Sequence, residues 1–127
     1  MSTLKADTIQ STGGGAATLT NQNAAKVFSG VATTDATAGD NFNISSLVDN
    51  STGNTTQNYT NALTSANYIA TFGARSSGIS DAYVNEWNAV NRTTTSIVTQ
   101  AQSASLGSVQ DISYAQMVIH GDLAGVR

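Results

Sequence analysis

The strongest strand signal in this chain is Ile112-Ser-Tyr-Ala-Gln-Met-Val-Ile-His-Gly-Asp-Leu123. Because side chains alternate along a strand, one face holds Ala115, Met117 and Ile119. The other face carries Tyr114, Gln116, Val118 and His120. Both faces are partly apolar, which is typical of a strand in the middle of a sheet. The segment therefore predicts a central β-strand.

A hairpin is predicted upstream of it. Phe42 and Ile44 alternate with polar neighbours, residues 49–53 are rich in turn formers, and a polar returning strand follows through Thr55 and Tyr59. The chain has no proline, so its turns must be set by Gly, Asn and Asp.

Further short strands are predicted along the rest of the chain. Residues 67–72 read as a core strand, residues 93–99 as a β-branched strand, and residues 100–110 as a loop. Residues 82–90 fit either a strand with a bulge or one helical turn. Several short strands bounded by turns predict an all-β fold, an antiparallel β-sandwich that is jelly-roll-like and occupies residues 24–127. Its expected core contains Phe42, Ile44, Tyr68, Phe72, Val118 and Ile119.

Residues 1–23 differ from this domain. Their large apolar residues are only Leu4, Ile9 and Leu19, separated by small polar residues and the glycines 13–15. Ordering such a segment costs more backbone entropy than its own burial returns. It is either a flexible tail or an extended oligomerisation or attachment arm, in which Leu4, Ala6, Ile9 and Leu19 meet other chains.

The segment Leu4-Lys-Ala-Asp-Thr-Ile-Gln-Ser-Thr-Gly-Gly-Gly-Ala-Ala-Thr-Leu-Thr-Asn-Gln22 resembles the opening of small virion structural and tail-fibre-like proteins of marine and cyanobacterial tailed bacteriophages. Two later phrases, Phe42-Asn-Ile-Ser-Ser-Leu-Val-Asp-Asn-Ser-Thr-Gly53 and Val118-Ile-His-Gly-Asp-Leu-Ala124, resemble the same family. The resemblance implies a compact β domain behind an arm that is ordered by threefold association. It also implies assembly in the host cytoplasm and a place in the virion.

Composition narrows the classes of function. Charged residues make up 10% of the chain, against about 25% in ordinary soluble proteins, and the net charge is -3. The few Lys and Arg are scattered singly, which argues against nucleic acid as a partner. The sequence has no long apolar run and no basic-then-apolar leader, so neither membrane insertion nor secretion is expected.

Catalysis and cofactors are not expected either. The chain has one histidine, no cysteine and a single glutamate, Glu86, too few groups for a metal site or an acid and base pair. The glycine run lacks the Lys and Ser/Thr of a phosphate loop. We therefore predict no catalytic residues, no metal and no cofactor.

Function must then lie in surfaces. Tyr83, Trp87 and Arg92 are the candidate host or partner contacts, because aromatic and arginine side chains combine large contact areas with polar groups. The alternative is that Trp87, the only tryptophan, is a core residue.

Three functions are compatible with this pattern. The first is a trimeric tail-fibre-like or knob module that contacts a host surface glycan or protein. The second is a capsid decoration (cement) protein. These two would bind a tail adaptor or the major capsid protein, respectively. The third is a carbohydrate- or ice-binding module, which the threonine content suggests although the threonines form no regular ladder.

Overall fold

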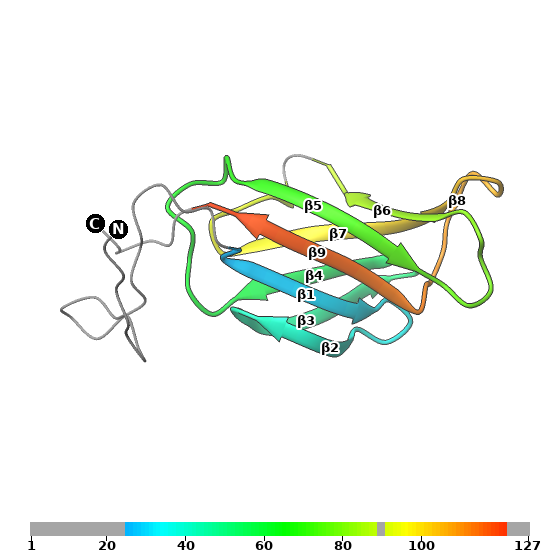
Figure 1. Cartoon of the computed structure of the whole chain (residues 1–127), viewed down its shortest axis with the longest axis horizontal. Coiled ribbons are helices and arrows are strands. Elements are labelled where there is room, and N and C mark those ends of the chain that lie inside the picture. The colour runs from blue at the N-terminus through cyan, green and yellow to red at the C-terminus, as the bar shows by residue number, and fades with distance from the viewer. Residues whose placement is uncertain (1–24, 89–90, 122–127) are drawn as a thin grey trace, which may run out of the picture.

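The computed structural model describes residues 25–88 and 91–121 of the chain. Their regular structure consists of nine strands (Figure 1). These are β1 (Val27–Ala32), β2 (Thr37–Phe42), β3 (Ile44–Ser51), β4 (Asn54–Tyr59), β5 (Ile69–Arg75), β6 (Ala82–Glu86), β7 (Ser96–Ser103), β8 (Ser108–Val109) and β9 (Tyr114–His120). No helix in this described part is long and apolar enough to cross a membrane.

The strands form two antiparallel sheets that pack face to face. One is four-stranded, in the order β2-β1-β9-β5, and the other is five-stranded, with β3-β4-β7-β6 in order and β8 paired to β7. The predicted all-β antiparallel sandwich is therefore confirmed. Consecutive strands pair as hairpins at β1–β2, β3–β4, β6–β7 and β7–β8. This is more pairing between consecutive strands than a jelly roll of two Greek keys contains.

β9 lies between β1 and β5, as its two partly apolar faces predicted. Ala115, Met117 and Ile119 are buried between the sheets. Tyr114 lies on the outer face and is partly exposed.

The predicted hairpin forms between β3 and β4, but Phe42 does not belong to it. Asn43 has a φ of 60°, and at this residue the chain leaves the four-stranded sheet and enters the other. Its side chain holds the bend by donating to Lys26 O at 3.2 Å and accepting from Asn61 N at 2.7 Å. Phe42 and Ile44 therefore lie in different sheets. Phe42 is not a core residue but is 50% exposed.

Three other predicted elements are corrected. The strand predicted at 67–72 is β5, an edge strand paired only with β9 among the described strands. Residues 82–86 form a plain strand, β6. The loop predicted at 100–110 is wrong in part, because β7 continues to Ser103 and β8 follows a turn. β1 and β2 were not predicted, since Gly30 and Gly39 weaken their strand signals.

The core consists of two apolar clusters. The first contains Val27, Tyr59, Leu63, Tyr68, Ile97, Met117 and Ile119. The second contains Val31, Val84, Ala101, Ile112 and Ala115. Phe72 is half-buried and packs against both clusters. Of the predicted core, Tyr68 and Ile119 are buried, whereas Ile44 and Val118 are only half-buried.

A buried polar layer lies between the two clusters. Ser29 of β1 donates to Gln57 Oε1 across the sandwich, and Gln57 Nε2 donates to Thr99 Oγ1 at 3.1 Å. Thr99 Oγ1 in turn donates to Thr55 O at 3.3 Å. The side chains of Ser29, Gln57 and Thr99 are all buried. Their polar groups are tolerated there because they satisfy one another.

We expect Gly53→Ala to lower the free energy of unfolding by about 2–3 kcal/mol. Gly53 has a φ of 67°, and an added Cβ would lie 2.6 Å from Gln110 O and 2.8 Å from Ala101 O. Gly107 is a matched control, because its φ is 59° but no atom lies within 4 Å of an added Cβ. Gly107→Ala should cost only about 1 kcal/mol. Equal losses in urea denaturation would contradict the steric explanation.

Candidate functional site

The arm residues Leu4, Ala6, Ile9 and Leu19 lie outside the described residues. The described chain begins at Ala25, next to the first strand. The three predicted contact residues, by contrast, are all described, and the structure separates them into two environments.

The side chain of Arg92 forms its contacts within the protein. Its Nε donates to Glu86 Oε1 at 2.9 Å, and its Nη1 donates to Tyr68 O at 2.7 Å. The guanidinium also lies 4.7 Å from the centroid of the Tyr68 ring. Tyr68 in turn shares a hydrogen bond of 3.0 Å with the Tyr59 hydroxyl, and burial raises the pKa of Tyr59. Arg92 therefore ties the loop after β6 to the core.

Tyr83 and Trp87 are exposed instead, by 41% and 44% of their surface. Alternation along β6 turns Val84 into the core and places Tyr83, Asn85 and Trp87 on the opposite side. Four residues of strand put the two aromatic positions about 13 Å apart. Between them, the enclosed Oδ1 of Asn85 has no hydrogen-bond partner in the described part of the chain. The interpretation of Trp87 as a core residue is wrong.

Neutral polar side chains continue this surface across the five-stranded sheet. Tyr83 Oη donates to Gln102 Oε1 at 2.6 Å, Gln102 donates to Gln100, and Gln100 Nε2 donates to Asn54 Oδ1 at 3.0 Å. On neighbouring strands Asn50 bonds Thr56 and Asn58 bonds Ser46. We call the surface formed by Tyr83, Asn85, Trp87 and Gln102, with the buried Gln100 and Asn54 beneath it, the amide face.

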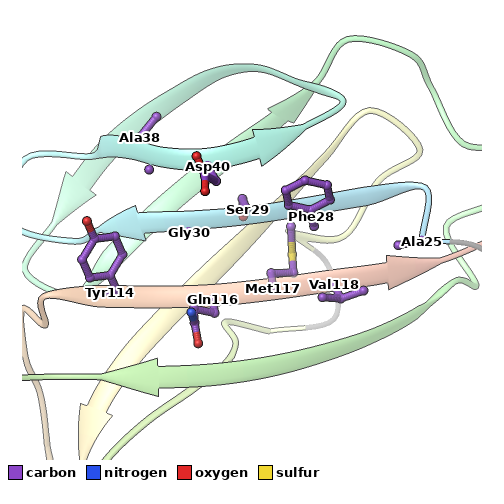
Figure 2. A pocket seen from close by; sticks show the side chains of 11 residues that line it. Ala25, Phe28, Ser29, Gly30, Ala38, Asp40, Tyr114, Gln116, Met117 and Val118 are labelled. Atoms are coloured by element: carbon purple, nitrogen blue, oxygen red, sulfur yellow. The ribbon is translucent and has the colours of Figure 1, made fainter.

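An open groove of about 960 Å³ crosses the outer face of the other sheet, between β2, β1 and β9 (Figure 2). Phe28 and Tyr114 stand toward its two ends. Gly30 and Gly39 carry no side chains, which leaves the space of the groove open above their backbone. A Cβ on Gly39 would lie 3.1 Å from the Tyr114 ring, so the ring packs directly over this backbone.

Three polar side chains of the groove are available for hydrogen bonds with a bound partner. Asp40, Tyr114 and Gln116 make no side-chain hydrogen bond within the described residues. In the amide face, by contrast, the side chains of Gln100, Gln102 and Asn54 already form hydrogen bonds with one another. The groove therefore has free donors and acceptors beside aromatic surface.

The described residues hold no cluster of three His, Cys, Asp or Glu side chains that could bind a metal ion. His120 stands at the end of β9, and its Nδ1 has no partner among these residues. What the described surface offers is shape, aromatic area and neutral hydrogen-bonding groups.

Comparisons of the chain with protein-family models, curated proteins and solved structures found no match. The assignment of function therefore depends on the two faces described above and on the resemblance of the sequence segments.

Sequence reasoning did not single out the groove. A signal was present, because the alternation of β9 places Tyr114, Gln116 and Val118 on one face. The glycines of β1 and β2 could have indicated a close approach of backbone and ring. The pairing of β1 with both β2 and β9, which brings these residues together, could not be read from local pattern.

Proposed function

We propose that this protein is a bacteriophage virion structural protein, a trimeric tail-fibre-like or knob module that is exposed on the particle and contacts the host. The amide face carries this proposal. It combines two half-exposed aromatic side chains, Tyr83 and Trp87, with the partly exposed amides of Asn85 and Gln102. Aromatic anchors with polar groups between them suit recognition of a host glycan or protein.

The low charge of the chain supports a role in assembly. Charged side chains protect sheet edges against pairing with other chains, and this protein has few of them. Contacts between subunits would cover such edges. We propose a homotrimer whose N-terminal arms join the subunits, and which attaches to another virion protein and acts by binding, without turnover.

Replacing Trp87 with alanine should reduce adsorption of the particle to host cells at least tenfold and leave particle assembly intact. Trp87 is chosen because its side chain is exposed and anchors nothing in either core cluster. Adsorption is measured as the fraction of particles removed from suspension by cells. Val48→Ala, an equally exposed apolar position on β3 of the same sheet, is the control and should adsorb normally.

Normal adsorption by the Trp87→Ala particles would contradict host contact through the amide face. Fragile heads after loss of the whole protein, with normal adsorption, would instead support the capsid decoration function.

A further inference from the structure

The outer face of the four-stranded sheet has an apolar row at the end where β1 begins. Strand register places Phe42 beside Phe28 and Phe28 beside Val118, so the apolar row crosses β2, β1 and β9 and ends at Thr71 of β5. The Phe28 and Phe42 rings stack with centroids 5.9 Å apart and an interplanar angle of 16°. Ile69, on β5 near the same end, is 68% exposed. Large contiguous apolar patches of this kind mark interaction surfaces.

The groove continues this row toward Tyr114. Figure 2 shows Ala25 at one end of the groove and Tyr114 at the other. Between them lie the free side chains of Asp40 and Gln116. An occupant of the whole face must therefore supply apolar side chains at the Phe28 end and polar or basic groups along the groove.

The chain before Ala25 has this chemistry. Leu4, Ala6 and Ile9 are apolar, and the residues between them are Lys5, Asp7 and Thr8, of which Lys5 is the only basic residue of the first 24. Residues 4–19 can span about 50 Å when extended, whereas the groove runs along β9 for only about 13 Å. A short part of the arm is enough to fill it.

The direction of β1 favours another copy over the same copy. β1 starts at Val27, beside Ile119, and runs toward Val31, beside Ala115. An arm bound in the groove of its own chain would have to run antiparallel to β1, whereas the arm of another copy can enter the groove from either end.

We propose that the apolar row and groove of the four-stranded sheet bind residues 4–19 of the N-terminal arm of a second copy of this chain. The inference rests on the homo-oligomer of the proposed function and names the surface that holds it. It also assigns opposite faces of the sandwich to different tasks, self-assembly on one and host contact on the other.

Disulfide trapping tests this directly, because the chain has no cysteine of its own. One full-length copy carries Ile9→Cys and a second carries Ala38→Cys, on the rim of the groove. After mixing and mild oxidation, we expect a linked pair on a non-reducing gel. Ile9→Cys mixed with Val48→Cys, on the opposite sheet, is the control and should give at least tenfold less linked product.

The two single-cysteine copies can link only between chains. A third variant carries Ile9→Cys and Ala38→Cys in the same chain. A disulfide that forms only in this variant, without an increase in mass, would overturn binding between copies. Equal yields with Ala38→Cys and Val48→Cys, or no link at either position, would overturn the groove as the docking surface.

Light scattering of the uncrosslinked protein gives a second readout. The full chain should have three times the 13.0 kDa chain mass, and deletion of residues 1–20 should reduce it to one chain. Phe42→Ser with Ile69→Ser should do the same, with circular dichroism unchanged. Trp87→Ser should leave the mass unchanged. An oligomer that persists in the Phe42→Ser, Ile69→Ser protein would overturn the proposal, whatever the adsorption experiments show about host contact.

Discussion

Leu63→Ala is expected to lower the free energy of unfolding by about 3 kcal/mol. Leu63 is only 2% exposed and packs with Tyr59, Tyr68 and Ile97 at one end of the sandwich. Truncation would remove apolar contacts and leave a cavity, because strands on both sides restrict collapse. For a domain of this size, that loss is a large part of the whole stability.

Leu106→Ala is the matched control. It makes the same chemical change in the β7–β8 turn, where the leucine is 64% exposed, and it should cost less than about 0.5 kcal/mol. Both values come from urea denaturation followed by circular dichroism. Similar losses at the two leucines would mean that the first apolar cluster is placed wrongly.

Gln57→Leu is expected to cost about 2–3 kcal/mol although leucine has nearly the same volume. The substitution removes the acceptor of the Ser29 hydroxyl and the donor to Thr99, and both residues are buried between the apolar clusters. The penalty arises from leaving those groups unpaired, since water does not reach them.

A triple variant separates this cause from simple packing. Ser29→Ala, Gln57→Leu and Thr99→Val together replace the polar layer with apolar groups of similar shape, and stability should return to within about 1 kcal/mol of wild type. A triple variant as unstable as Gln57→Leu alone would contradict the account of the polar layer as a mutually satisfied network.

Strands with clear alternation were predictable. β9 shows this best, because Ala115, Met117 and Ile119 alternate with its outward residues and the strand is central as expected. The hairpin of β3 and β4 was predictable from the turn residues that precede Asn54. Both features depend on local pattern, which the sequence displays directly.

Features set by long-range geometry were not predictable. Phe42 and Ile44 alternate like one strand, but the positive φ of Asn43 sends them to different sheets. Leu63 belongs to no strand, and its burial depends on how the loop after β4 folds over the core. Gln57 has a polar side chain that a hydrophobic pattern assigns to the surface.

In the candidate site too, residue type could be used for prediction but long-range geometry could not. Tyr83 and Trp87 were predicted as contacts from residue type, and both are exposed on the side of β6 away from the core. Arg92 was predicted as a contact for the same reason, but its side chain is held within the protein. Its partners, Glu86 and Tyr68, could be recognised only once the loop after β6 was placed against the core.

The most direct test of the proposed function is antibody-gold labelling of purified particles of a phage that encodes this chain. We expect label on intact particles, concentrated at the tail, and loss of label when the chain is deleted. Label spread over the head would assign the chain to capsid decoration. Particles that carry no label, with the protein found only in the infected cell, would contradict a role as a virion structural protein.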